Sequence, residues 1–351
     1  MALRLSKTMA MLQVLISSIL FLLTIFTEVI SEREDNRQVL PPLACQTDQV
    51  MQEYYNQNAN ALKENQQFEI STRRFVSTRQ APKSYIIPVV FHVYGTDFAG
   101  SRVNDTIIKK ALEKVNEDFH GLNNDFHAVH TAFQGRRSTF DVTFKLARKD
   151  PNGRPTTGIV YHPAKNGYAT NNFNSDVQKE AWNNYKYCNV YIQLDIYGNG
   201  GLTSSGVAWY PDSGMSNANL ARIVYNGRYL YGNTNDEFSS VLTHEFAHWL
   251  NLYHTFEHGC VNSVEGQCDQ TGDRVCDTPQ TVGNQGCQPV NNCLGQLVNS
   301  ENYMDYSGAY GCYRMFTVGQ VARMEAAMQH PSRKPLWQSQ NLIATGVTGN
   351  S

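Results

Sequence analysis

The segment His244-Glu245-Phe246-Ala247-His248 carries the residue types and the spacing that most clearly suggest chemistry. On a helix, residues i and i+4 lie on one face, so the imidazoles of His244 and His248 can reach the same metal ion. Glu245 follows the first histidine and can reach a water molecule bound to that ion. Zinc lowers the pKa of such a water to about 7. The segment therefore predicts zinc-dependent hydrolysis by a zinc-bound water, with Glu245 as general base and then general acid.

His254 is the expected third ligand, because a catalytic zinc site needs three protein ligands and one open position. A helix that continued past His248 would carry His254 away from the metal, so the chain must turn sharply between them. Asn251 lies where this turn is needed, and asparagine adopts the left-handed conformation more readily than other non-glycine residues. Two histidines and a glutamate at this spacing occur by chance in many chains. The larger set that also includes His254 occurs by chance much less often.

Two other functions are compatible with the same residues. A structural zinc site would need a fourth protein ligand, for which His258 is the nearby candidate. A secreted binding protein could keep the fold of such an enzyme without catalysing a reaction, although the intact zinc ligands and Glu245 favour an enzyme. Proteolysis that a chelator blocks would distinguish the enzyme from both alternatives.

The composition permits a folded core and gives no sign of a nucleic-acid partner. The chain has 351 residues, which suits one large domain or two small ones, and 41% of them are hydrophobic. The net charge is −2, with no long run of one sign. A nucleic-acid-binding protein usually carries a basic patch or stripe, and none is visible here.

Residues 1–31 are typical of a signal peptide. Arg4 and Lys7 precede an apolar stretch that is densest from Val14 to Phe26. An uncleaved signal anchor is the alternative, because residues 9–30 are long enough to span a membrane, but polar residues within them disfavour it. We expect a secreted, extracellular protein that has no membrane association after signal cleavage, and we expect a monomer.

Eight cysteines agree with export, and six of them crowd into residues 260–312 among many polar and glycine residues. In an oxidising compartment this pattern predicts a loop-rich region held by disulfides. A cysteine zinc cluster is disfavoured because no two of these cysteines have C-x₂-C spacing. Spacing alone leaves the pairing open. The six cysteines are Cys260, Cys268, Cys276, Cys287, Cys293 and Cys312.

The remaining chain divides into a polar segment and a long domain. Residues 32–82 are rich in Gln, Asn, Glu and Arg and are expected to form a pro-segment or spacer rather than a core. Residues 83–345 are the expected catalytic domain, with an N-terminal subdomain to about 251 and a C-terminal subdomain from about 252. Strands interleaved with helices indicate an α/β fold. Hydrophobic periodicity predicts strands at 85–94, 140–146, 190–196 and 206–210, and helices at 104–119, 237–251 and 320–329, the last with Thr317 as N-cap.

A methionine within Glu301-Asn302-Tyr303-Met304-Asp305-Tyr306 follows the third histidine by about 50 residues. At this point the chain resembles the metzincin metallopeptidases, and within them the pappalysin family of ulilysin-like and cytophagalysin-like enzymes. The resemblance covers about residues 83–330. The strings that carry it are LTHEFAHWLNLYHTF (242–256), CDTP (276–279), NYMDYS (302–307), FTVGQVARM (316–324), IPVVFHVY (87–94) and ARKDPNGRPTTGIV (147–160).

The resemblance implies a metzincin catalytic domain: a twisted, mostly parallel sheet with the active-site helix, followed by a loop-rich, disulfide-stapled C-terminal subdomain. It implies an endopeptidase that acts on protein or peptide substrates with zinc bound by His244, His248 and His254. Met304 would form an apolar floor beneath the metal, and Tyr306 would stabilise the tetrahedral intermediate. Residues 206–210 would be the edge strand that pairs with an extended substrate.

The resemblance also implies three further features. The disulfides would be Cys260–Cys293, Cys287–Cys312 and Cys268–Cys276. Calcium would bind at a segment that includes Asp273, Asp277 and Thr278, since oxygen-rich loops suit that ion. Cys45 could ligate the zinc in a zymogen. A Cys45–Cys188 disulfide and two unrelated thiols are the alternatives for these two cysteines.

The chain departs from the family pattern at three places. Asn251 stands where glycine is usual, and asparagine can make the same turn. Val318 replaces a proline at a helix start. Residues 307–311 contain no acidic side chain, whereas ulilysin-like enzymes use one there to favour a basic residue after the scissile bond. We therefore do not expect basic specificity.

Overall fold

The structure is a computed structural model that describes residues 45–78, 83–231, 233, 239–257, 268–283, 286–292 and 294–348. The chain divides into two compact units, Met1–Pro41 and Pro42–Ser351, and every described residue belongs to the second. Within the described ranges, no helix is long and apolar enough to cross a membrane. The predicted signal peptide, His258, Cys260 and Cys293 lie outside these ranges.

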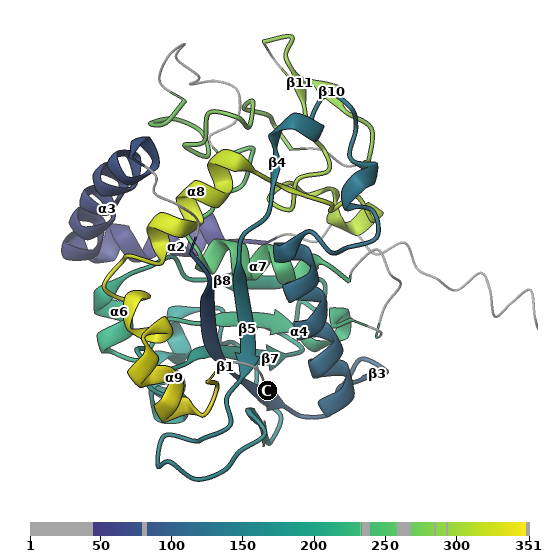
Figure 1. Cartoon of the computed structure of the whole chain (residues 1–351). Helices are drawn as coiled ribbons and strands as arrows, with labels where there is room; N and C mark the ends of the chain where they lie inside the picture. Colours follow the sequence, from purple (N-terminus) through teal and green to yellow (C-terminus); the bar gives the residue numbers. More distant parts are fainter. Residues whose placement is uncertain are drawn as a thin grey trace, which may run out of the picture. The chain divides into compact units, whose positions relative to one another are not determined.

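A six-stranded sheet forms the centre of this unit (Figure 1). Its strand order is β5-β1-β7-β9-β8, and β6 also pairs with β1. Every pairing is parallel except that of β8 with β9, so β8 is an antiparallel edge strand. The strands are β1 (Tyr85–Tyr94), β5 (Val142–Leu146), β6 (Ile159–His162), β7 (Cys188–Gln193), β8 (Gly206–Ala208) and β9 (Ile223–Asn226). The expected mostly parallel sheet is confirmed.

Near-continuous apolar runs explain why β1 and β7 lie at the middle of the sheet. Nine of the ten residues of β1 are buried, and all six of β7 are buried. Strands that are covered on both faces need apolar side chains at successive positions, rather than the alternation of a half-exposed strand. The sequence YIIPVVFHVY satisfies this requirement, and its proline sits near the strand's start.

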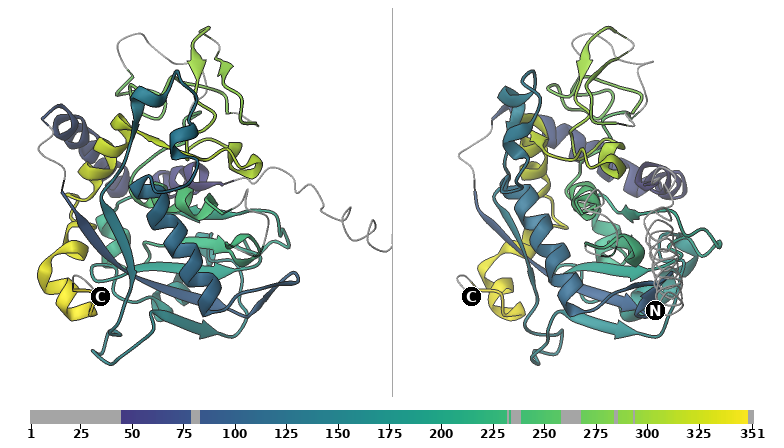
Figure 2. Two further views of the ribbon diagram at one scale, coloured as in Figure 1. Left: turned by 45° about the vertical axis from the view of Figure 1, so that its right-hand side comes forward. Right: turned by 90° about the vertical axis from the view of Figure 1, so that its right-hand side faces the viewer.

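Helices α4 (Asp105–His120) and α7 (Val241–Trp249) pack against each other and against strands of the sheet (Figure 2). The Asn104 side chain caps α4 by accepting from the Ile107 N–H, and Gly121 ends the helix with a φ of 65°. The buried face of α4 includes Ile108, Leu112, Val115 and Phe119. The predicted amphipathic helix is therefore present within one residue of its expected bounds.

Two helices precede the sheet, α2 (Thr47–Gln57) and α3 (Ala59–Ser77). The expectation that residues 32–82 lack core residues was wrong for this part of the chain. Val50, Met51 and Tyr55 lie on one face of α2 and belong to the same buried cluster as Trp209. A polar segment can still contribute to a core when its few apolar residues recur at helical spacing. Figure 1 shows α3 beside α8 (Val318–Ala327), and these two helices are in contact.

The remaining elements are short. Thr317 begins α8 with a capping box, as predicted, so Val318 in place of proline does not prevent the helix start. The other helices and strands are α5 (Asn174–Glu180), α6 (Ser213–Asn217), α9 (Ser339–Thr345), β2 (Asp97–Phe98), β3 (Ser101–Arg102), β4 (Arg137–Ser138), β10 (Val290–Asn291), β11 (Leu297–Val298) and β12 (Phe316–Thr317). Single 3-10 turns lie at Phe126–Ala128, Gln134–Arg136, Asn171–Phe173, Gly227–Tyr229, Ser307–Tyr310 and Lys334–Trp337.

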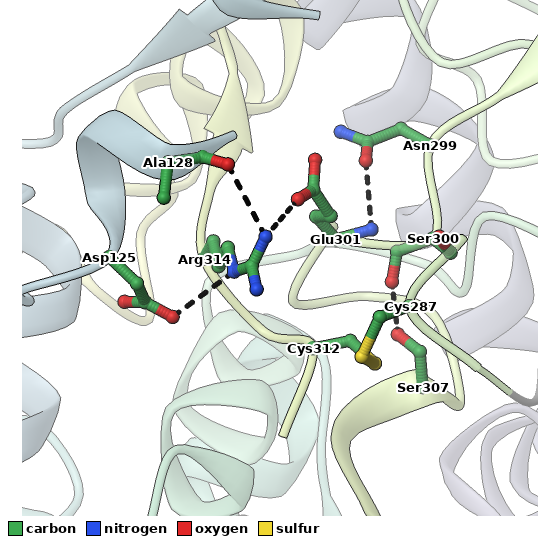
Figure 3. The surroundings of a disulfide bond; sticks show 9 residues. All are labelled: Asp125, Ala128, Cys287, Asn299, Ser300, Glu301, Ser307, Cys312 and Arg314. Atoms are coloured by element: carbon green, nitrogen blue, oxygen red, sulfur yellow. Dashed lines mark hydrogen bonds and ion pairs between the residues drawn. A yellow bond between two sulfur atoms is a disulfide. The ribbon is translucent and has the colours of Figure 1, made fainter. Parts of the chain in front are cut away.

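Most of the described residues between α7 and α8 lie outside helices and strands, and two disulfides join parts of this stretch. Bonds join Cys268 to Cys276 and Cys287 to Cys312, which are two of the pairs that the family resemblance implied. Figure 3 shows the second bond beside Arg314, whose guanidinium contacts Asp125, the Ala128 carbonyl and Glu301. Disulfides of this kind restrict the unfolded chain, so a region with little apolar packing can still be stable.

Candidate active site

Helix α7 carries His244, Glu245 and His248, and its surroundings fix its position. All nine of its residues are buried. The Phe246 ring lies 4.4 Å from the Phe144 ring on the sheet, and the Thr243 hydroxyl donates to the Asp118 carboxylate of α4 at 2.6 Å. Because every residue of α7 is buried, protein encloses the helix on all sides. The side chains of His244, Glu245 and His248 are therefore held by a helix that packs on both the sheet and α4.

Asn251 makes the sharp turn that the sequence required. Its φ is 72°, in the left-handed region. The Asn251 N–H donates to the His248 carbonyl at 2.8 Å, and the Leu252 N–H donates to the Ala247 carbonyl at 3.0 Å. These bonds are the usual way in which a left-handed residue ends a helix. The chain then returns toward α7, and His254 comes to lie beside the two helical histidines.

The Nε2 atoms of the three histidines converge on one point. They are separated by 2.9 Å (His244–His248), 3.1 Å (His248–His254) and 3.2 Å (His244–His254). The Nδ1 atoms face acceptors instead: Nδ1 of His244 lies 2.6 Å from the Tyr303 carbonyl, and Nδ1 of His248 lies 2.7 Å from the Leu252 carbonyl. His254 Nδ1 faces the Asp48 carboxylate. If each Nδ1 carries the proton, three Nε2 lone pairs point at one another.

Three convergent lone pairs repel one another unless a cation lies between them. Burial lowers the pKa of His248 to about 3 and also lowers the pKa of His244, with the neighbouring imidazoles adding to the effect. Both rings are therefore neutral at physiological pH, which is the form that binds a metal. The hydrogen bonds at Nδ1 fix the ring orientations, as the outer partners of metal ligands do. The donor set fits a transition metal that accepts imidazole nitrogen.

Glu245 lies beside these histidines and is buried. Burial raises the pKa of its carboxyl to about 8, although a hydrogen bond from Cys45 opposes the shift. The Cys45 Sγ atom is 3.6 Å from Glu245 Oε2. The ligand atoms of Cys45 and the three histidines all lie within 4.8 Å of one another. Cys45 and Cys188 are both buried free thiols, so the structure does not contain the alternative Cys45–Cys188 disulfide.

Residues 45–48 cross the site from the edge strand β8 to the turn that contains Met304. The Ala208 N–H of β8 donates to the Thr47 hydroxyl at 3.0 Å, and the Tyr306 hydroxyl donates to the Cys45 carbonyl at 2.5 Å. Asp48 accepts hydrogen bonds from His254 Nδ1 and from the Tyr210 hydroxyl. Sequence reasoning missed Asp48, because a carboxylate three residues after Cys45 has no spacing rule that links it to His254.

The turn that contains Met304 is tied to both parts of the histidine motif. The Tyr303 carbonyl faces His244 Nδ1, and the Met304 carbonyl accepts from the Thr255 N–H at 3.1 Å. Met304 itself is fully buried. The Tyr306 ring lies edge-on to His254, with 5.0 Å between ring centroids. The turn that carries Met304 and Tyr306 therefore lies against the histidine motif, and the roles that the resemblance implied for these two side chains stay predictions.

Tyr313 and Gly206 also border the site. Sequence reasoning missed Tyr313, and it named Gly206 only as the start of the expected edge strand. The Tyr313 ring stacks on His244 with an interplanar angle of 7°, and its hydroxyl is 3.2 Å from His244 Nδ1. Gly206 begins the edge strand against Glu245. A Cβ atom added to Gly206 would lie 2.6 Å from Glu245 Cδ, closer than real Cβ contacts. The glycine therefore leaves space for the carboxylate.

The residues expected to bind calcium lie elsewhere and are engaged in local hydrogen bonds. Asp273 accepts from the Thr278 hydroxyl at 2.6 Å and from the Val275 N–H at 3.1 Å. Asp277 accepts from the Thr317 hydroxyl at 2.6 Å and from the Gly319 N–H at 2.8 Å. Clusters of three or more candidate ligands within the described ranges do not include them. Calcium binding at this segment stays a prediction.

A helix with two histidines and a glutamate, a third histidine after a left-handed turn and an antiparallel edge strand together define a metallopeptidase of metzincin architecture. The family model described as pregnancy-associated plasma protein-A matches residues 171–329. An extracellular metalloprotease of Verticillium alfalfae is 31% identical over 255 residues, which cover 68% of this chain and 74% of the relative. One from Podospora anserina is 29% identical, covering 79% and 84%. The chain belongs to the pappalysin family and is a metallopeptidase.

Solved structures agree with this assignment. A mutant of Tannerella forsythia promirolysin is 25% identical and matches with a TM-score of 0.69, covering 88% of this chain and 99% of its own. Mature mirolysin from the same organism, in complex with a cleaved peptide, is 28% identical and matches with a TM-score of 0.62, covering 76% and 99%. The expected α/β metzincin fold is confirmed, including its disulfide-bonded C-terminal region.

Proposed function

We propose that this chain is a secreted zinc-dependent endopeptidase that is made as a latent zymogen. The observation that carries the proposal is the convergence of three Nε2 lone pairs, 2.9–3.2 Å apart, beside the buried carboxyl of Glu245. His244, His248 and His254 would hold the zinc ion, since three imidazoles plus one exchangeable position form a catalytic zinc site. When bound, zinc supplies the Lewis acidity that activates water for attack.

Glu245 is the proposed general base and acid. It takes the proton of the attacking water and delivers it to the amine of the leaving peptide. Its carboxyl is buried and its pKa is raised by that burial, so a change in its surroundings can shift its proton affinity. Gly206 supports this role, because the absent side chain leaves room for the carboxylate against the edge strand.

Tyr306 is the proposed donor to the oxyanion of the tetrahedral intermediate. In the full chain its hydroxyl donates to the Cys45 carbonyl. A carbonyl oxygen from the pro-segment thus occupies the position that a substrate carbonyl would reach after activation. A preplaced donor of this kind stabilises charge that develops in the transition state.

Substrate would bind as an extended strand along β8. The N–H of Ala208 on this edge strand bonds to the Thr47 hydroxyl, so it is available to a peptide only after the pro-segment leaves. The mirolysin structure described with a cleaved peptide favours peptide substrates for this chain as well. The absence of an acidic residue in 307–311 favours a cleavage preference that does not depend on a basic residue.

Latency would come from Cys45. Its Sγ atom joins the three imidazoles in one cluster of candidate ligands, so the thiolate could fill the fourth zinc position. Burial and Glu245 raise the pKa of the free thiol, and a metal ion would have to offset that cost. Export is favoured by the signal-like residues 1–31 and by relatives that are named extracellular metalloproteases.

The decisive experiment compares Glu245→Ala with the wild type. Each full-length protein is secreted, activated by limited proteolysis between α3 and β1, and assayed on casein. We expect the variant to retain one equivalent of zinc and to lose activity by at least about a hundredfold. A chelator should abolish the wild-type activity, and added zinc should restore it. Glu113→Ala, at an exposed position on α4, is the matched control.

Each competing function has its own outcome. Zinc-loaded Glu245→Ala that cut casein at the wild-type rate would overturn the role of Glu245. Activated wild-type protein that bound peptides without cutting them would instead support the non-catalytic binding protein. Metal that cannot be removed without unfolding the protein, together with no hydrolysis, would support a structural site.

A further inference from the structure

We infer that Arg274 and Arg323, which we call the arginine pair, form a carboxylate-binding site that accepts an acidic group of a peptide once the pro-segment has left. The inference rests on the proposed function, because it requires that residues 45–78 are released on activation. In the full chain the occupant is Glu69 of α3, and its carboxylate shows what the site binds.

The contacts of Glu69 are those of a built anion site. Arg323 approaches it with both terminal nitrogens, one at 2.9 Å from Oε2 and the other bonded to Oε1. Arg274 Nη1 is 3.1 Å from Oε2, and the Tyr253 hydroxyl donates to Oε1 at 3.3 Å. Glu69 is 4% exposed and Arg323 is 2% exposed. A two-pronged guanidinium–carboxylate contact away from water is among the strongest polar contacts that proteins make.

The catalytic domain arranges the arginine pair without help from α3. The Arg323 Nε atom donates to the Asn251 carbonyl at 2.7 Å. Both guanidinium groups lie over the Tyr253 ring, at 4.8 Å for Arg323 and 4.9 Å for Arg274. Arg274 lies in the loop that the Cys268–Cys276 disulfide closes. These contacts all remain when α3 departs, so the two positive groups keep their orientation.

Glu69 is the carboxylate that neutralises the arginine pair. Burial alone would raise its pKa, but Arg323 and Arg274 overcome that effect and lower the pKa to about 2. Departure of α3 would remove the carboxylate that both guanidinium groups bind, and another carboxylate would bind favourably in its place.

The location of the pair explains why the carboxylate should belong to a polypeptide. Tyr253, on which both guanidinium groups lie, packs against Tyr210 with 4.8 Å between centroids, and the Tyr210 ring is 6.0 Å from that of His248. One continuous segment, from Cys45 at the histidines to Glu69 at the pair, already connects the two places. A substrate bound along β8, or the released α3 segment, could reach the pair in the same way.

The first arm of the test scans substrates with the full chain after activation. Fluorogenic peptides of one sequence carry a single Glu or Gln at successive positions on either side of the scissile bond. At the position that reaches the pair, we expect kcat/KM for Glu to exceed that for Gln by about tenfold. Arg274→Gln should remove the preference, while Arg154→Gln, with a side chain 72% exposed, should retain it. A preference that persists in Arg274→Gln overturns the inference.

The second arm measures binding and needs no catalysis. A labelled peptide of residues 59–77 is added to the activated protein, and its Kd is compared with that of the Glu69→Gln peptide. A Kd about tenfold weaker for Glu69→Gln, with the difference lost in Arg274→Gln, supports the site and identifies the released pro-segment as a ligand. Equal binding of both peptides together with a flat substrate scan overturns it. If the activated protein cuts nothing, the proposed function fails while this arm still decides the site. Thermal unfolding of Arg274→Gln and Arg274→Lys confirms that both fold.

Discussion

The sheet region (residues 83–250) and the loop region (residues 251–316) each supply part of the site, but they hold their residues by different means. In the sheet region, α7 places His244, Glu245 and His248 through close apolar packing and regular backbone bonds. In the loop region, His254, Met304 and Tyr306 depend on a left-handed turn, disulfides and single hydrogen bonds. Side chains that are held by close packing are hard to displace, because many contacts must change together. Side chains that are held by a few bonds can be displaced when one bond is lost.

This difference between the two regions has a consequence for function. Residues 45–48 contact both regions: Thr47 bonds to the edge strand of the sheet region, and the Cys45 carbonyl accepts from Tyr306 of the loop region. If residues 45–78 are released on activation, as proposed, the Ala208 N–H on the edge strand and the Tyr306 hydroxyl on its loop both lose a partner. We therefore expect changes in the loop region to alter stability and activation, and changes beside α7 to alter catalysis itself.

Removal of the Cys287–Cys312 disulfide is expected to have the largest effect on stability. The bond closes a separation of 25 residues in a region with little regular structure. Cys287→Ser with Cys312→Ser should lower the free energy of unfolding by about 3 kcal/mol, measured by urea denaturation. Cys188→Ala, a buried free thiol of the sheet region, is the control and should cost about 1 kcal/mol. Equal losses for the two changes would contradict the contrast between the regions.

Gly206→Ala tests the packing of the sheet region around Glu245. The new methyl group would overlap the carboxylate, whose flexible side chain can move away. We expect kcat/KM of the activated enzyme to fall by about a hundredfold, because a displacement of about 1 Å misplaces the general base. Thermal stability should change little. Gly135→Ala is the control, since no atom lies within 4 Å of the added carbon. Normal activity in Gly206→Ala would show that the site tolerates the shift.

Substitution of Asn251 isolates the turn that presents His254. Within the described ranges its side-chain atoms have no hydrogen-bond partner, so its contribution lies in the backbone conformation. Asn251→Ala should lower stability by about 1–2 kcal/mol, since alanine is strained in the left-handed region. Asn251→Gly should fold at least as well as the wild type. Circular dichroism melts and zinc titration would measure both effects, and equal behaviour of Ala and Gly would refute the explanation.

The smallest effect expected is that of mild acid on the docking of α3. The pKa of Glu69 is about 2 in the folded chain, against 4.5 for the ordinary group. Its stabilising effect is therefore complete above pH 4.5 and is lost as the pH falls toward 2. At pH 4 the loss should be less than about 1 kcal/mol. Cleavage between α3 and β1 should therefore speed up slightly at pH 4 in the wild type but not in Glu69→Gln. Identical pH profiles would exclude Glu69 as the responsible group.

Local patterns in the sequence predicted the elements that are determined locally. The apolar run of residues 85–94 is β1, and the periodicity of residues 104–119 is α4. Thr317 is the cap of α8, although the helix begins two residues earlier than predicted. Helices α2 and α3 were missed because their burial depends on contact with Trp209 and Tyr210, which lie more than a hundred residues away. No local rule reports such contacts.

Residue types and helical spacing were enough to predict the donor chemistry: two histidines and a glutamate on one helix, a third histidine after a residue that can turn left-handed, and cysteines typical of an exported protein. These conclusions follow from residue type and helical spacing, which do not depend on the rest of the fold. The tertiary structure alone decided which distant groups meet that chemistry. Asp48 at His254, Tyr313 on His244 and Glu69 between two arginines are contacts across many residues, and packing rather than spacing brings them together.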